Sequence, residues 1–528
     1  MALETIMWFR DDLRLIDNDA LTWAVQTASE RGTTLLPVFI HEVPTDHAVR
    51  PLGQAAYWWQ QASLAALRED LKAHGLPLLE LVGDPVELVP AIARALNASA
   101  VAWCRRYDLP RRSIDAEVKA ALAKSEGTVV HSFPGYLLTE PWEVQTTTGG
   151  GYKVLTPFSK KAMGFVADCL DGVQVPSQAP DFTAVAPLNT ALEEQRSDGF
   201  APYLKEMWSQ LERGGVTQKE HEKTSEQAPA WAMKVLQGWQ PGEHGARRRL
   251  VDFLQQAQGI ADYARGRDYP ARPVTSGLSP HLRSGEISPR ALWAAAIEST
   301  ELLDSVESDG VKAVETFLKE LLWRDFAWHR LYERPDLATR NVRKEFDDFD
   351  WAWPSDSVRE AAMQMKDDLG NSDRGAHGES ADGSFCAWAT GSTGVDIVDA
   401  GMRELWATGT MHNRVRMIVG SFLTKNLGLH WQAGERWFWD TLVDADYASN
   451  PFNWQWVAGC GDDASPYFRI FNPVTQAKKF DPERDYIQQW VPVASGDEAR
   501  APMVDLKESR AAALEAYELM RAQRGRSG

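Results

Sequence analysis

The first 135 residues alternate two kinds of apolar pattern, and this alternation restricts the fold more than any other feature. Short apolar runs that suit buried strands occur at residues 6–9, 35–40, 78–82, 101–103 and 129–130. Between them lie stretches with helical spacing, such as 55–73 and 87–96. Apolar strands separated by amphipathic helices are typical of a parallel sheet covered on both faces. The pattern predicts a doubly wound α/β domain with a parallel five-stranded sheet over residues 1–135.

The remainder of the chain lacks that alternation. Between about residues 150 and 240 the periodicity breaks down, with three successive glycines at 149–151 and a polar run at 219–227. Such composition is typical of a connection, and we expect residues 136–240 to link two domains. After residue 250 the spacing is helical nearly throughout, as in Val415, Ile418, Val419, Phe422 and Leu423. The pattern predicts an all-α domain over residues 241–528.

Composition and charge narrow the class of protein. The chain has no run of about 18 apolar residues, and its N-terminus carries no basic and apolar leader. We therefore expect a cytoplasmic protein without a membrane span. The four cysteines have no short paired spacing, which predicts neither a disulfide framework nor a zinc site. The net charge of −18 argues against a surface coated by nucleic acid but allows a local basic groove, because phosphate affinity depends on the local field.

Short catalytic motifs are missing from the sequence. There is no G-x-x-x-x-G-K-[ST], H-E-x-x-H, strand-bound G-x-G-x-x-G or G-x-S-x-G, which disfavours P-loop and common hydrolase mechanisms. The informative segments are longer. They lie at residues 8–21 (WFRDDLRLIDNDAL), 275–282 (TSGLSPHL), 285–290 (GEISPR), 320–326 (ELLWRDF), 411–417 (MHNRVRM), 444–446 (DAD), 454–456 (WQW) and 467–473 (YFRIFNP).

In this order the blocks resemble the cryptochrome/photolyase family, and most closely its class I cyclobutane pyrimidine dimer DNA photolyases. The resemblance implies an FAD cofactor in the helical domain. The matching positions on its diphosphate side are Tyr263, Arg267, Thr275, Ser276, Gly277, Leu278 and Ser279, and those around its flavin and ribose are Phe317, Arg324, Asn413, Arg416, Asp444, Asp446 and Asn450. Hydroxyl and amide groups at a helix start suit phosphate, although the same residues could serve only as helix caps. Asp444 and Asp446 could likewise be helix-start charges.

Asn450 matches the family position that faces flavin N5. An amide can donate to or accept from N5 without supplying a proton outright, which suits an electron-rich flavin. Plant cryptochromes typically carry Asp at this place. Asn450 therefore favours repair over signalling.

A second set of side chains bears on which type of DNA lesion the protein would repair. Glu320 and Trp323 are three residues apart and share a helix face. The resemblance implies that Trp323 and Trp456 stack on flipped pyrimidines. It also implies that Glu320 is protonated in a dry pocket and donates to a pyrimidine carbonyl. Asn413 and Met417 complete this catalytic set, and the histidines expected for (6–4) lesions are absent from these positions.

Three further tryptophans match the family's electron-transfer chain to the flavin. They are Trp454, Trp431 and Trp351. Trp353 competes with Trp351 for the outer end, because the two lie only two residues apart. We leave both open.

The expected partner is UV-damaged DNA, bound by a monomer without an obligate protein partner. The resemblance places the following residues at the DNA: Arg267, Glu320, Trp323, Arg324, Arg414, Trp456 and Arg469, with Lys478 and Lys479 nearby. Arg324 and Arg414 could instead pair with internal acids such as Asp325, which is a common fate of helix arginines.

Some positions depart from the family pattern. Phe317 stands where a tryptophan is frequent beside the flavin, Thr410 where a tryptophan often precedes the MHNR block, and Asp396 where a proline is common. The α/β domain also lacks the Asn-Glu pair of one folate antenna site. A second chromophore of the methenyltetrahydrofolate or deazaflavin type stays open. The resemblance implies light-dependent repair of cyclobutane pyrimidine dimers by electron transfer from reduced FAD. The alternative function is that of a cryptochrome-type blue-light receptor that signals through protein partners.

Overall fold

The computed structural model describes residues 4–124, 127–185, 230–255, 259–303, 308–364, 380–463, 468–491 and 501–524. Five parallel strands form one sheet in the order β3-β2-β1-β4-β5. Their bounds are β1 (Thr5–Phe9), β2 (Leu35–Glu42), β3 (Leu79–Gly83), β4 (Ala100–Cys104) and β5 (Val129–Phe133). The helices between them are α1 (Asp19–Arg31), α2 (Gln54–Ala73), α3 (Pro85–Ala95) and α4 (Leu109–Leu122). The predicted fold class is confirmed.

Alternate residues of β1 feed two separate cores, because successive side chains of a strand point to opposite faces. Ile6 and Trp8 pack with apolar side chains of α3 and α4. Met7 and Phe9 pack with side chains of α1 and α2. The strand is buried at every position, which explains why all of its residues after Thr5 are apolar.

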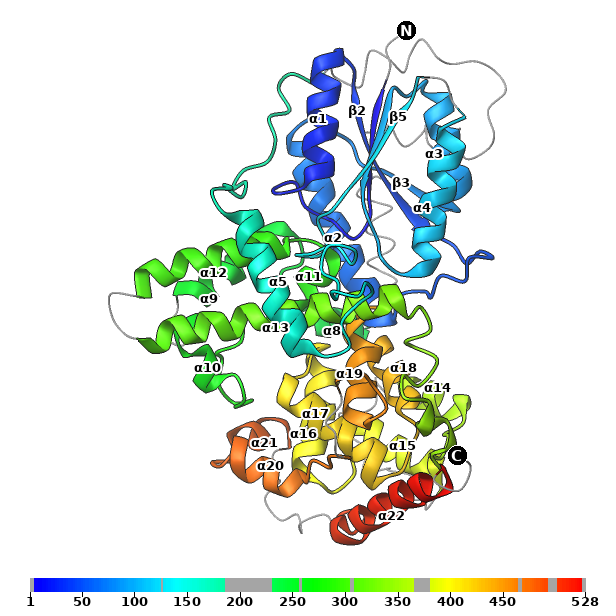
Figure 1. Ribbon diagram of the computed structural model, residues 1–528, viewed down its shortest axis with the longest axis vertical. Coiled ribbons are helices and arrows are strands. Elements are labelled where there is room, and N and C mark those ends of the chain that lie inside the picture. The colour runs from blue at the N-terminus through cyan, green and yellow to red at the C-terminus, as the bar shows by residue number, and fades with distance from the viewer. Residues whose placement is uncertain are drawn as a thin grey trace.

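The rest of the described chain is helical (Figure 1). A first group comprises α9 (Glu243–Gln255), η3 (Ile260–Asp262), α10 (Tyr263–Gly266), α11 (Ser279–Ser284), α12 (Pro289–Leu303) and α13 (Ser308–Glu333). A second group comprises η4 (Lys344–Asp348), α14 (Asp356–Gln364), α15 (Ala381–Thr390), α16 (Asp396–Thr408), α17 (Asn413–Ser421), the π-helical η6 (Phe422–Asn426), α18 (Trp431–Thr441), α19 (Ser449–Ala458), α20 (Pro473–Phe480), α21 (Asp485–Trp490) and α22 (Leu506–Arg524). Each group has its own apolar core. Within the described ranges, no helix is long and apolar enough to cross a membrane.

The predicted connection over 136–240 contains more regular structure than its broken periodicity suggests. Residues 186–229 lie outside the described part, but α5 (Leu155–Leu170) and α8 (Ala230–Leu236) fall within this segment. Phe158 of α5 packs against Phe326 of α13, with ring centroids 5.2 Å apart. The first part of the segment therefore belongs to the core of the helical part.

Two sequence blocks that lie far apart in the chain meet where the sheet joins the helices. Arg14 is buried, and its Nη1 donates to the carbonyl of Gly285 at 2.9 Å. Gly285 has φ +67°, and a Cβ on it would lie 2.0 Å from the carbonyl oxygen of Asp11. Only glycine allows this approach. Asp17 adds an ion pair with Arg290 from the same block.

A buried carboxylate strengthens this junction. Glu286 accepts hydrogen bonds from Trp59 Nε1 at 3.0 Å and from Ser63 Oγ, both on α2. It also accepts from Nδ1–H of His281 on α11. All four side chains are fully or almost fully buried. One acid thus satisfies three polar groups from two elements.

We predict that Glu286→Ala lowers the free energy of unfolding by about 3–5 kcal/mol, because it leaves buried polar partners unpaired. Glu286→Gln should lose less, since its amide oxygen can still accept from Trp59. Urea denaturation followed by circular dichroism measures both. Glu518→Ala, an exposed change on α22, serves as control. A loss no larger than that of the control would contradict the assigned role.

Candidate functional site

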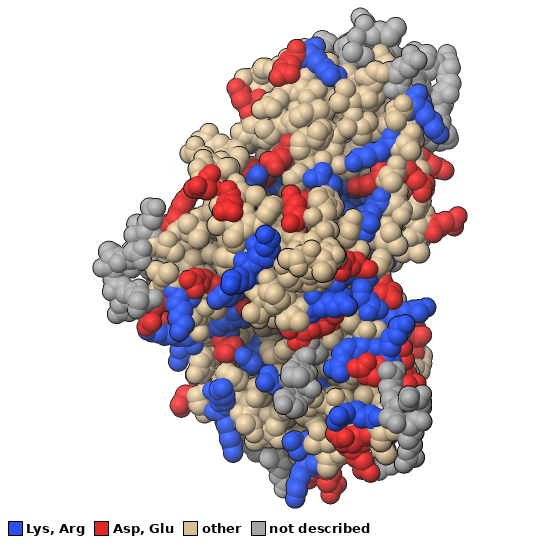
Figure 2. Space-filling model, viewed as in Figure 1, with Lys and Arg blue, Asp and Glu red and all other residues tan. Residues whose placement is uncertain are grey.

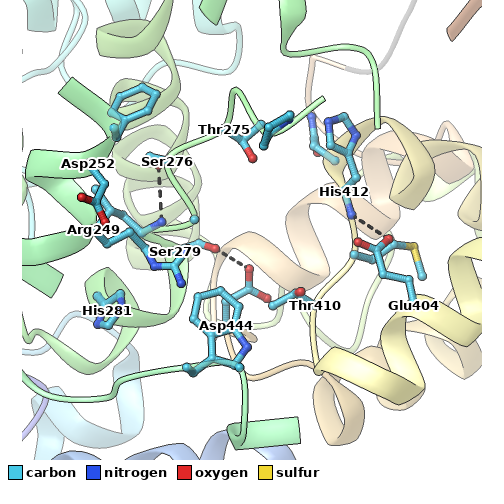
Figure 3. Close-up of a pocket in the computed structure, with 18 of the residues that line it drawn as sticks. Arg249, Asp252, Thr275, Ser276, Ser279, His281, Glu404, Thr410, His412 and Asp444 are labelled. Carbon is cyan, nitrogen blue, oxygen red and sulfur yellow. Dashed lines mark hydrogen bonds between the residues drawn. The ribbon is translucent and has the colours of Figure 1, made fainter. Parts of the chain in front are cut away.

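A cavity of about 970 Å³ opens between the first helical group and the α16–α17 region (Figure 3). Ligand sites commonly occupy 300–1,000 Å³, so this one suits an extended ligand. Its wall is built from α9, the loop before α11, the connection from α16 to α17, and Asp444. The lining residues that carry a charge or an aromatic ring are Trp239, Arg248, Arg249, Asp252, Phe253, Tyr263, Arg272, His281, Glu404, His412, Arg416 and Asp444.

Hydroxyl groups and one ion pair occupy the middle of the cavity. Thr275, Ser276 and Ser279 stand on the loop that enters α11. Ser279 Oγ donates to Asp444 Oδ2 at 2.7 Å, and Arg416 Nη2 donates to the same oxygen at 2.8 Å. The Asp444 side chain is almost completely buried. Asp444 is therefore a charge-balanced acceptor at the base of the cavity.

The opposite wall carries two titratable groups. Glu404 accepts from Tyr486 Oη at 2.6 Å and from the backbone N–H of His412 at 3.3 Å, and burial raises the pKa of its carboxyl. Burial lowers the pKa of His412 to about 4, so its imidazole is neutral at pH 7. Its Nδ1 accepts from the N–H of Arg414 at 3.2 Å. Nε2–H is then a buried donor without a hydrogen-bond partner among the described residues.

The donor set fits FAD. Hydroxyl groups and arginines suit a diphosphate, and a buried carboxylate suits sugar hydroxyls. The unpartnered Nε2–H of His412 is a further donor for a polar ligand atom. The sequence analysis did not single out Arg249, Asp252, Glu404 or His412 as cofactor residues.

The predicted cofactor residues divide into two sets. Those that line the cavity are Tyr263, Thr275, Ser276, Gly277, Leu278, Ser279, Asn413, Arg416 and Asp444. Of the others, Phe317 packs edge-on to Tyr263 with centroids 5.5 Å apart. Arg324 Nη1 donates to the carbonyl of Tyr136 at 2.7 Å. Asp446 is buried, and its Oδ1 accepts from the backbone N–H of Ala448 at 2.8 Å, just before α19 begins.

Asn450, expected beside flavin N5, is buried and bonded within the protein. Its Nδ2 donates to the backbone carbonyl of Glu435 at 3.0 Å and to Glu435 Oε1 at 2.8 Å. The carboxylate of Glu435 is in turn held by both terminal nitrogens of Arg50, at 2.7 and 3.0 Å. Asn450 is therefore held in one orientation.

Glu320 forms an ion pair with Arg267, and its side chain is 32% exposed. The protonated state that the resemblance implies for Glu320 stays a prediction. Arg267 also lies over the ring of Tyr263, 5.2 Å from its centroid, which connects Glu320 to the cavity wall.

The other residues that the resemblance places at the lesion lie on α13, α17 and α19. Asp268, adjacent to Arg267, accepts from Arg414 at 2.7 Å, and Arg414 contacts Met417 Sδ at 3.7 Å. Trp323 packs on Phe452 of α19, with centroids 6.1 Å apart. Trp456 lies one turn further along α19, and its Nε1 donates to the carbonyl of Asp463 at 3.0 Å. Neighbouring residues 267 and 268 thus tie α13 to α17.

The predicted electron-transfer tryptophans belong to the core of the second helical group. Trp454 and Trp431 are buried there, and Trp431 Nε1 donates to Asn341 Oδ1 at 2.8 Å. His430 stacks on Trp431 and also on Trp353. The ring centroids of His430 and Trp353 lie 3.9 Å apart. Trp353 is 50% exposed, whereas Trp351 is only 6% exposed.

Basic side chains on the visible face are interspersed with acids over the helical half and form no large single-sign field (Figure 2). Arg414 and Arg267 are paired with acids, and Arg324 bonds a carbonyl. By contrast, Arg469 is exposed and lies over Phe471, which stacks near Trp456. Lys478 and Lys479 are exposed on α20. Arg324 also lies 3.9 Å from Asp325, so both Arg324 and Arg414 have the acidic partners that the pairing alternative describes.

Comparison with known proteins agrees with this geometry. A DNA photolyase family model matches residues 5–180, and one described as the FAD binding domain of DNA photolyase matches residues 317–500. Deoxyribodipyrimidine photo-lyase of Agrobacterium fabrum is 41% identical over 495 residues, which cover 93% of this chain and 88% of the relative. Cryptochrome-2 of Arabidopsis thaliana is 32% identical over 495 residues, which cover 93% and 71%.

Among solved structures, a bacterial class III photolyase from Agrobacterium tumefaciens has a TM-score of 0.76 and 38% identity, covering 99% of this chain and 98% of that one. The class I assignment is not confirmed by this likeness. FAD as the cofactor agrees with the matched binding domain and with the donor set of the cavity. By its two matched domains and its full-length relatives, the chain belongs to the DNA photolyase family.

Proposed function

We propose that the protein is a deoxyribodipyrimidine photo-lyase that repairs cyclobutane pyrimidine dimers in DNA under blue light. The proposal rests on one observation: the residues that line the cavity adjoin the residues expected around the lesion. Tyr263 and Asn413 line the cavity. Arg267 lies over Tyr263, and Arg414 follows Asn413 on α17. The cavity wall is thus continuous with the Glu320 and Met417 side, where a flipped-out pyrimidine dimer would meet the cofactor.

The residues around the lesion have distinct proposed roles. Trp323 and Trp456 offer ring faces on which unstacked pyrimidines lie. Reduced FAD, when bound, supplies the electron that starts cleavage of the dimer. Arg267 turns to a DNA phosphate, which releases Glu320. Once a lesion excludes water from Glu320, its neutral form is favoured and can donate a hydrogen bond to a pyrimidine carbonyl.

Electron supply to oxidised FAD uses the buried tryptophans. We assign the inner steps to Trp454 and Trp431. For the outer end, exposure and stacking favour Trp353, because it reaches solvent and contacts His430 face to face. Trp351 is buried, and its Nε1 is bonded to the carbonyl of Thr424. Trp351 is the alternative.

DNA binding relies on a few phosphate contacts. Arg469 and the pair Lys478 and Lys479 are exposed and border aromatic rings that reach the lesion side. Arg414 contributes only after its pair with Asp268 opens. We also propose that the protein acts as a monomer in the cytoplasm, and that a second chromophore, if bound, is carried by the α/β domain.

The first test is light-dependent repair. The holoenzyme should restore an oligonucleotide that contains a cyclobutane dimer under blue light and leave it unchanged in the dark. It should not repair a (6–4) photoproduct. Liquid chromatography of the oligonucleotide measures both reactions. Failure to repair dimers with fully reduced FAD would favour the blue-light receptor alternative.

A second prediction concerns Glu320. Glu320→Ala should retain FAD and bind damaged DNA but slow dimer splitting by about ten- to a hundredfold, because a hydrogen bond to a developing charge is lost. Glu320→Gln keeps a neutral donor and should recover most of the rate. Transient absorption of the DNA complex measures splitting. Glu315→Ala, an exposed change on α13, is the matched control. Equal splitting rates in both alanine variants would contradict the role proposed for Glu320.

A third prediction separates electron supply from repair. Trp454→Phe should abolish photoreduction of oxidised FAD but repair normally after chemical reduction. Trp353→Phe should slow photoreduction more than Trp351→Phe does. Absorbance during illumination with an external reductant follows the reaction, and the exposed Trp142→Phe is the control. Normal photoreduction in Trp454→Phe would place the electron path elsewhere.

A further inference from the structure

Arg249 is a cation on the wall of the cavity that forms no salt bridge with the residues that the structure describes. It stands on α9 and lies over the ring of Trp239, 4.4 Å from its centroid. Its side chain is partly buried, and burial lowers the pKa of its guanidinium although Asp252 lies nearby. No carboxylate of the described residues forms an ion pair with it. Figure 3 shows Arg249 beside Ser276 and Ser279, across the cavity from Glu404 and His412.

The balance of charge around the cavity isolates Arg249 further. Arg416 is neutralised by Asp444. Arg248 and Arg272 also line the cavity but are exposed to solvent. Arg249 is thus the partly buried cation that faces the hydroxyl groups of the 275–279 loop. A partly buried guanidinium beside hydroxyl groups is suited to an anion, since its planar fork matches phosphate oxygens.

Gly277 is fitted to the position of that guanidinium. Its φ is +61°, and a Cβ on it would lie 2.6 Å from Arg249 Nη1 and 3.4 Å from Cζ. Any side chain at 277 would therefore push Arg249 away from the loop. The positive φ adds strain for residues other than glycine. The backbone of the loop and the guanidinium of α9 consequently share one small space.

We infer that Arg249 binds the diphosphate of the dinucleotide cofactor and that Gly277 keeps the space Arg249 needs. The sequence blocks that carry the family resemblance contain Gly277 but not Arg249, so the partner comes from a separate helix. The inference rests on the proposed FAD-dependent function and adds a binding residue to its cofactor site. It also implies that affinity depends on the diphosphate charge and is weakened by salt.

The test measures FAD release from the holoenzyme. After dilution, free FAD is followed by the rise in flavin fluorescence at low and at high salt. Arg249→Gln should release FAD about ten- to a hundredfold faster than the unaltered protein at low salt, as expected for loss of a charged hydrogen bond. Its release should also respond less to salt. Arg249→Lys keeps the charge without the fork and should be intermediate, and Arg521→Gln, exposed on α22, should be unchanged.

A double-variant cycle tests the role of Gly277. Gly277→Ala should also speed release, because the added methyl displaces the guanidinium. The combined variant Arg249→Gln with Gly277→Ala should release FAD much more slowly than the product of the two single effects predicts, since both remove the same contact. Independent, multiplicative effects would overturn the link between the two residues.

The outcomes separate this inference from the proposed function. If the unaltered protein holds no FAD, the proposed function fails. If it holds FAD and Arg249→Gln releases it within twofold of the unaltered rate with the same salt response, the inference alone fails. If circular dichroism shows that Arg249→Gln is unfolded, Gly277→Ala decides, because it displaces the guanidinium without removing it. Unaltered release from Gly277→Ala overturns the inference.

Discussion

The contact between α11 and the α/β domain holds one wall of the cofactor cavity in place. His281 of α11 lines the cavity and donates a hydrogen bond to Glu286. The carboxylate of Glu286 also accepts hydrogen bonds from Trp59 and Ser63 of α2. The backbone approach of Gly285 to Asp11 fixes the same helix from its other end. Because a packed interior transmits displacement, a shift of the sheet against the helices would move the loop at 275–279. The cavity is therefore a product of both parts of the chain.

Much of the positive charge near the site is neutralised by pairing with acids. Arg267, Arg414 and Arg416 each pair with an acid close to the site. These pairs hold α10, α13 and α17 in position, but they leave little free positive charge for DNA. Screening by neighbouring acids limits the surface field, and Figure 2 shows both signs interspersed on the visible face. Under the proposed function, DNA phosphates compete with internal acids for Arg267 and Arg414, which would couple binding of damaged DNA to release of Glu320.

Local sequence pattern predicted the strands, because strand periodicity is visible along the chain, whereas the loop at 275–279 was identified through its resemblance to the family. It did not predict α5, whose register against α13 depends on tertiary packing of Phe158. It missed Arg249 and Glu404 as cavity residues, since each reaches the cavity from a helix outside the blocks that carry the family resemblance. The family resemblance assigns Asp446 to the cofactor, and only three-dimensional geometry shows that its carboxylate also accepts from the backbone N–H of Ala448 just before α19. The positions of Trp351 and Trp353 in the sequence do not show which side chain reaches solvent. Their exposed fractions are seen only in the structure.

The bonding of Asn450 limits what it can offer to a cofactor. A neutral amide has two N–H donors and one carbonyl acceptor. Both Nδ2 contacts go to oxygens of Glu435, which can only accept while its carboxylate is held by Arg50. The remaining polar atom is Oδ1, so Asn450 can accept a hydrogen bond but has no donor free and no proton to give. Arg50 belongs to the segment between β2 and α2. The α/β domain thus fixes, through one ion pair, the polarity of an amide in the helical domain.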